Sequence, residues 1–136
     1  MSFKVPYAAE LDTESQMLNY FLGNSYMGLL GSSLTVGTGT TLLNCTAVEC
    51  TFTGYARYNL TAWSGPAIDG SGAAATTVTA YFTPTGGGGS GNIYGYFLTD
   101  SGSTYFYGVE VFTTPVSAPT GIQVAIQLTY TVISRY

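Results

Sequence analysis

The feature that most constrains the fold is a strict alternation of apolar and other residues near the C-terminus. Every second position from Ile122 to Val132 is apolar, and the positions between are uncharged and mostly polar. A two-residue period is that of a β-strand with one face toward a core and one toward water. Eleven residues at about 3.3 Å each would span roughly 36 Å, which is long for a strand. The pattern therefore predicts a long, half-buried strand, with Ile122, Val124, Ile126, Leu128, Tyr130 and Val132 facing inward.

Other segments after Gly23 also read as strands. Val78, Ala80 and Phe82 face inward in one of them, and two others are aromatic on both faces, which is typical of central strands covered from both sides. The turn sequence Asp100-Ser101-Gly102-Ser103 predicts a hairpin. The expected strands are Tyr26–Leu30, Leu42–Phe52, Tyr55–Trp63, Thr76–Thr83, Ile93–Thr99 and Tyr105–Phe112, with loops at Gly31–Thr41, Ser64–Ala75 and Gly86–Gly91.

These elements predict a mainly β protein: an antiparallel β-sandwich or a jelly-roll-like barrel over residues 26–133. The first 14 residues differ, because they hold four of the ten charged side chains. Asp12–Leu22 is expected to be the one helix, with a Thr13/Gln16 capping box and Gly23 as its stop. Residues 1–9 read as an extended arm, and the 136 residues as one domain.

Composition narrows the function. Histidine is absent, which excludes His-containing catalytic triads and His-ligated zinc. Three cations are too few for nucleic-acid binding, and no apolar run is long enough for a transmembrane helix. Cys45 and Cys50 are expected to be reduced, with a disulfide across a tight turn as the alternative, and without further thiols they make no metal site. We expect no cofactor.

Acidic residues offer little for catalysis. Asp69 and Asp100 lie beside glycines in turns, where aspartate commonly bonds its own backbone. Glu49 and Glu110 read as facing solvent or pairing with Arg57, which we expect to have a structural role through a carboxylate of Glu49, Asp100 or Glu110. We therefore expect no enzyme. A carbohydrate-binding module is the alternative, because the 12 tyrosines and Trp63 could stack on sugars.

Several short motifs occur in an order that resembles small bacteriophage virion proteins of the tail-fibre-like and capsid-decoration-like kind. The likeness covers most of the chain, and Gly54-Tyr55-Ala56-Arg57 is its distinctive motif. The sequence departs from the family in its cysteine pair and in a longer Ala/Gly loop after Trp63. The matching stretches are Met17–Gly23, Tyr26–Leu29, Glu49 before Gly54–Arg57, Ile93–Asp100, Tyr107-Gly108, Thr113–Pro115 and Ile122–Val132.

The resemblance implies a non-enzymatic structural protein of the virion. A compact domain without a repetitive shaft favours a capsid decoration (cement) protein bound to the major capsid protein, and a tail or tail-fibre subunit is the alternative. The structural residues would be Glu49, Gly54, Tyr55 and Arg57.

Assembly is the last expectation. A long strand with so few charges is poorly protected against edge pairing, which predicts a homo-oligomer, a dimer or a trimer. In the arm, Phe3, Val5, Pro6 and Tyr7 are apolar and precede any sheet, so we expect them to contact a neighbouring subunit. The alternative is that the arm folds back over its own domain.

Overall fold

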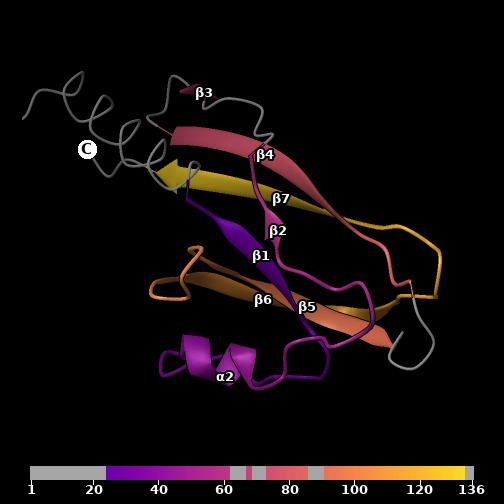
Figure 1. Cartoon of the computed structure of the whole chain (residues 1–136). Helices are drawn as coiled ribbons and strands as arrows, with labels where there is room; N and C mark the ends of the chain where they lie inside the picture. The colour runs from indigo at the N-terminus through magenta and orange to yellow at the C-terminus, as the bar shows by residue number, and fades with distance from the viewer. Residues whose placement is uncertain (1–23, 62–66, 69–72, 86–90, 134–136) are drawn as a thin grey trace, which may run out of the picture. The chain divides into compact units, whose positions relative to one another are not determined.

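The computed structural model describes residues 24–61, 67–68, 73–85 and 91–133. The predicted arm and the predicted helix Asp12–Leu22 lie outside this part of the chain. In chain order the elements are β1 (Tyr26–Leu30), α2 (Leu42–Thr46), β2 (Tyr58–Asn59), β3 (Ala67–Ile68), β4 (Ala73–Phe82), β5 (Asn92–Thr99), β6 (Phe106–Ser117) and β7 (Val124–Ile133) (Figure 1). The protein is mainly β, as its two-residue periodicity predicts.

Four strands form an antiparallel sheet in the order β2-β1-β5-β6. β1 pairs with β5 along its whole length, from Tyr26 opposite Thr99 to Leu30 opposite Gly95. β5 lies between two strands and is buried from Gly95 to Thr99, so the prediction that it is a central strand is confirmed. The hairpin predicted at residues 100–103 connects it to β6.

The prediction that Tyr105–Phe112 is a central strand is wrong. β6 ends its sheet, and its side chains are half-buried at first and exposed after Phe112. Aromatic residues on both faces of a strand do not require a partner strand on each side of it. Their rings can pack partly against the sheet and remain partly in water.

β6 follows β5 irregularly. Ile93 is opposite Val116, but Gly95 is already opposite Val111, so Phe112–Pro115 bulge out beside a single residue of β5. Glycine is required at position 95, because a Cβ there would overlap the carbonyl of Glu110. The backbones of β5 and β6 therefore lie too close together beside the bulge to admit a side chain at position 95.

A second sheet has the order β3-β4-β7. Val124, Ile126 and Leu128 of β7 are buried while the residues between them are exposed, which confirms the predicted alternation over this part of the strand. The side chains of Tyr130 and Val132, also predicted to face inward, lie outside the described ones. Ile122 is an exception, 57% exposed, because the strand begins two residues after it. In β4 the predicted inward residues, Val78, Ala80 and Phe82, are all buried.

Two loop and strand boundaries also need correction. The predicted loop Ser64–Ala75 contains β3 and the start of β4, where Ala67 pairs with Ala75 and Ile68 with Ala74. The predicted strand Tyr55–Trp63 shrinks to β2. Alanines have weak β-propensity of their own, and those of β3 and β4 adopt the strand beside a partner. β2 is short because only Tyr58 and Asn59 find partners, in β1.

The prediction of a strand over Leu42–Phe52 is wrong: its first half forms α2, and the rest is turn and loop that makes a single β-bridge, between Glu49 and Leu30. Thr41 and Asn44 make a reciprocal capping box: the Asn44 N–H donates to Thr41 Oγ1, and the Thr41 N–H donates to Asn44 Oδ1 at 2.9 Å. Leu42 and Cys45, three residues apart, both pack toward the core. The cap and the three-residue spacing favour a helical turn over the strand.

Contacts divide the chain into two compact units. Residues 25–59 and 80–126 make one unit, which holds the four-stranded sheet and α2. One hydrophobic cluster of this unit is built on Leu30, Cys45 and Phe97, and the half-buried residues packed against them are Leu34, Leu42, Val48, Tyr94, Phe106, Val109 and Val111. The other unit includes β3 and most of β4 and β7.

Candidate functional site

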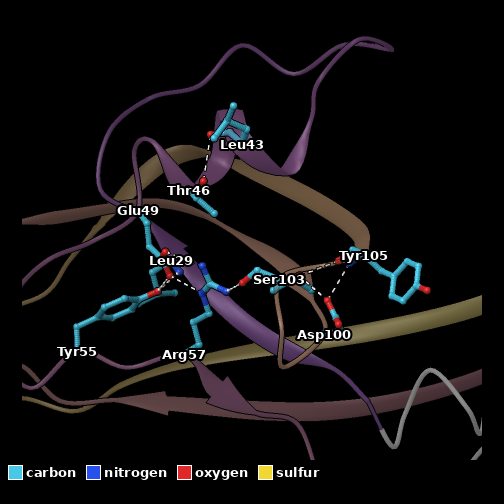
Figure 2. A network of polar contacts seen from close by, with 10 residues as sticks. Leu29, Leu43, Thr46, Glu49, Tyr55, Arg57, Asp100, Ser103 and Tyr105 are labelled. Carbon is cyan, nitrogen blue, oxygen red and sulfur yellow. Dashed lines mark hydrogen bonds and ion pairs between the residues drawn. The ribbon is translucent and has the colours of Figure 1, made fainter.

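Arg57 and Glu49 form the main polar contact of the four-stranded unit (Figure 2). Arg57 Nε donates to Glu49 Oε2 at 2.8 Å, and Arg57 Nη2 donates to Glu49 Oε1 at 3.0 Å. The two side chains are 24% and 16% exposed. Of the three carboxylates that the sequence leaves open as partners of Arg57, the structure selects Glu49, and the bond to Glu49 raises the pKa of Arg57.

Tyr55 joins this pair to the backbone of β1. Its hydroxyl donates to Glu49 Oε2 at 2.5 Å and accepts the Leu29 N–H at 3.0 Å. Burial, and then the bond to Glu49, raise the pKa of Tyr55 well above its ordinary value. The phenol therefore stays neutral and keeps both hydrogen bonds.

These contacts cover the edge of β1 where β2 ends. β2 pairs only with Tyr26 and Met27. Farther along, the Cys50 N–H donates to the Leu29 carbonyl at 2.9 Å and the Gly31 N–H donates to the Val48 carbonyl at 2.7 Å. The Tyr55 hydroxyl accepts the remaining Leu29 N–H, so a side chain takes the place of a strand carbonyl.

Two glycines make room for the network. Gly54 has a φ of +87°, which residues with a side chain rarely adopt, and a Cβ there would press on the Thr85 side chain. The turn it forms, closed by the Tyr55 N–H and the Phe52 carbonyl at 3.0 Å, directs Tyr55 toward β1. Gly28 of β1 leaves space that the Phe97 ring fills.

Arg57 also reaches the β5–β6 hairpin. Its Nη1 donates to Ser103 Oγ, and its guanidinium lies 5.3 Å from the centre of the Phe97 ring. Ser103 has a φ of +55°, which is uncommon for a residue with a side chain. One arginine thus contacts the segment after α2 through Glu49, the β5–β6 hairpin through Ser103, and strand β5 through Phe97.

The other described carboxylates also bond within the protein. Asp100 Oδ1 accepts the N–H groups of Thr104 at 2.7 Å and Tyr105 at 2.8 Å, and these bonds lower the pKa of Asp100. Glu110 accepts the Tyr96 hydroxyl at 2.5 Å, and burial and this bond raise the pKa of Tyr96. Asp100 therefore bonds its own turn as predicted, and Glu110 pairs with a tyrosine and not with Arg57.

Both cysteines are free and buried. Burial, with the nearby charge of Glu49, raises the pKa of the Cys50 thiol to about 11, so it stays protonated near neutral pH. Within the described ranges, no group of three or more His, Cys, Asp or Glu side chains is placed to hold a metal ion. In the same part of the chain no helix is long and apolar enough to cross a membrane.

Of the predicted site residues, the structure brings Glu49, Gly54, Tyr55 and Arg57 together. Phe3, Val5, Pro6 and Tyr7, as well as Asp69 and Trp63, lie outside the described residues. Sequence reasoning missed Ser103 and the Leu29 backbone. A signal existed for Ser103 in its glycine-containing turn, but none for Leu29.

Comparison with known proteins adds no family to this geometry: no family model, curated protein or solved structure matches the chain.

Proposed function

We propose that this chain is a non-enzymatic structural protein of a bacteriophage virion, and that it decorates the capsid shell. The observation that carries the proposal is the use of its charged groups. Glu49, Asp100, Glu110 and Arg57 are the charged residues of the described part, and each makes hydrogen bonds within the protein. Their role is to hold strands and turns together.

A surface with so few charges suits wide contact with other proteins. Charge is depleted at the centres of protein interfaces, and uncharged contacts depend little on salt. Thr, Ser and Tyr supply hydroxyls that can bond a partner without the desolvation cost of an ion. The sequence resemblance to small virion proteins points the same way, through Glu49 and the Gly54–Arg57 motif on which the network is built.

We propose further that the two antiparallel sheets belong to a sandwich or a jelly-roll-like barrel, and that the major capsid protein is the partner. A compact β-domain fits a clamp at capsomer junctions, whereas a fibre needs a long repetitive shaft. A tail or tail-fibre position is the alternative, and the localisation in both cases is the assembled virion.

Copy number per particle tests the proposal. Quantitative mass spectrometry of purified virions should find hundreds of copies if the protein covers the shell. A small multiple of three or six would place it in the tail and contradict decoration, and its absence from virions would contradict both. Saturable glycan binding by the purified protein would favour the carbohydrate-binding alternative.

The N-terminal arm gives a second test. Phe3, Val5, Pro6 and Tyr7 are proposed to contact a neighbouring subunit. A chain without residues 1–9 should keep its circular dichroism spectrum and thermal midpoint but no longer join particles. Assembly at normal copy number would exclude this role for the arm.

A further inference from the structure

Four strands end the two sheets of the described chain: β2 and β6 in one sheet, β3 and β7 in the other. The end strand of a sheet has unpaired backbone groups that can pair with another chain. Proteins usually prevent this with very short end strands, charges, prolines, bulges or covering segments. An end strand without such a feature is open to pairing with another chain.

Three of the four end strands, β2, β3 and β6, have such a protecting feature. β2 and β3 have two residues each, and the edge of β1 beyond β2 is covered by Tyr55 and the segment 48–50. β6 is interrupted by its bulge at 112–115, contains Pro115, and carries Glu110. These strands offer little continuous backbone for pairing.

Among the described residues, β7 shows none of these protecting features. It is ten residues long, and from Val124 to Ile133 it contains no charged residue, no proline and no glycine. Its described side chains alternate without interruption: Val124, Ile126 and Leu128 are buried, and Ala125, Gln127 and Thr129 are exposed.

We propose that β7 pairs with β7 of a second copy of this chain, antiparallel and around a two-fold axis. In an antiparallel ladder, two opposite residues both direct their backbone groups toward the partner strand or both away from it. A two-fold ladder is therefore centred on one residue, and residues opposite each other belong to the same face. Buried residues of one copy then lie beside buried residues of the other, and the core side of the sheet continues across the pair.

The same geometry explains why the occupant is a second copy. Self-pairing places residues of the same strand face opposite one another, which is unfavourable where both carry the same charge. β7 has none, so every register centred on Gln127, Leu128 or Thr129 is free of like-charge contacts. This inference deepens the proposed assembly role by naming a surface and its partner.

The test adds charge to the exposed face of β7. In Q127K/T129K, lysine lies opposite lysine in a register centred on residue 127, 128 or 129. The matched control is T113K/T114K, which adds the same two charges to exposed positions of the β6 bulge. Sedimentation velocity and light scattering of the purified full chain give the mass, and circular dichroism with thermal melting checks that each variant folds.

The wild type and the T113K/T114K control should have the mass of two chains, and Q127K/T129K should fall to the mass of one. A second variant, Q127E/T129K, places opposite charges together in the register centred on Leu128 and should retain the dimer there. Loss of the dimer in Q127E/T129K but not in the wild type would assign a register centred on 127 or 129, which still supports pairing. If Q127K/T129K does not fold, hydrogen exchange of the wild-type β7 amides decides, since pairing predicts protection that decreases on dilution.

A monomeric wild type would overturn the inference, and so would a dimer that Q127K/T129K leaves unchanged. Neither result would contradict the proposed function, which depends on copy number in the virion. Conversely, a chain absent from virions could still dimerise through β7, so the two proposals fail separately.

Discussion

The two sides of the four-stranded sheet end in different ways. On the β1 side, polar side chains cover the backbone: the Tyr55 hydroxyl accepts the Leu29 N–H, and Glu49 and Arg57 hold Tyr55 in place. On the β6 side, the backbone itself is irregular, with a close approach at Gly95 followed by a four-residue bulge. One edge depends on a hydrogen-bond network and the other on the absence of a side chain.

This difference predicts how each edge fails. A network of partly buried groups loses stability when one member is removed, because the others lose their partners. A close backbone approach fails when a single carbon atom is added. The loss of stability on substitution should therefore differ in size between the two sides.

Gly95→Ala should have the largest effect. The new Cβ would overlap the Glu110 carbonyl and press on Val111, both of which are backbone on the neighbouring strand. β5 and β6 would have to separate, and we expect the free energy of unfolding to fall by about 3 kcal/mol or more, as in severe overpacking. Chemical denaturation measures the change.

Gly108→Ala is the matched control, because a Cβ at position 108 meets no atom within 4 Å. It should change stability by less than about 0.5 kcal/mol, as surface substitutions usually do. Equal effects at positions 95 and 108 would show that general glycine flexibility, and not close approach, decides the β6 side.

Arg57→Ala comes next. It leaves Glu49 without its two-point partner in a site where the side chains are 24% and 16% exposed. The cost should lie between that of exposed and fully buried ion pairs, at about 2 kcal/mol. An unchanged melting temperature would contradict a structural role for Arg57, and Arg57→Lys, which keeps the charge but loses the planar two-point geometry, should recover only part of the loss.

Tyr55→Phe tests the hydroxyl alone. It removes the acceptor of the Leu29 N–H and one donor to Glu49 while keeping the ring that stacks on Phe82. We expect a loss of about 1–2 kcal/mol and faster hydrogen exchange at the Leu29 amide. Tyr105→Phe, at a side chain 59% exposed, is the control and should change neither quantity.

The sequence predicts a strand well where its hydrophobic pattern and its pairing with a neighbouring strand favour the same structure. β1 occurs at its predicted bounds, and β5 and β7 differ from theirs by one or two residues. In β7 the apolar residues recur every second position, whereas β1 and β5 are short runs of mostly apolar and aromatic residues. α2 was missed because Leu42–Phe52 is rich in apolar and β-branched residues, while the capping pair Thr41/Asn44 that favours the helix has a weaker sequence signal. The position of β6 at the end of its sheet depends on pairing between distant segments, which local periodicity does not record.

The site was predicted in part for a similar reason. Arg57 is the one cation between Lys4 and Arg135, and a partly buried arginine needs a carboxylate. Because the chain has few carboxylates and Glu49 is the nearest in sequence, this pair could be inferred. Tyr55 could be assigned to the site by its place in the motif. Its bond to the Leu29 N–H could not be predicted, because every residue except proline has a backbone N–H and no residue type marks this one. The contact with Ser103 joins positions 46 residues apart and follows only from the folded sheet.

Asp100→Asn should have the smallest effect and tests the hairpin that joins β5 to β6. Bonds from the Tyr105 and Thr104 N–H groups lower the pKa of Asp100 in the folded protein, so folding favours the ionised form. Its contribution is therefore present above the pKa of an unfolded aspartate, about 3.9, and is lost as pH falls through the lower folded value. Asparagine keeps an acceptor oxygen but no charge, so the stability gap between wild type and variant should be seen at neutral pH and shrink toward about pH 2. Urea denaturation across this range measures the gap, and a gap that does not change with pH would mean that the charge of Asp100 contributes nothing to the turn.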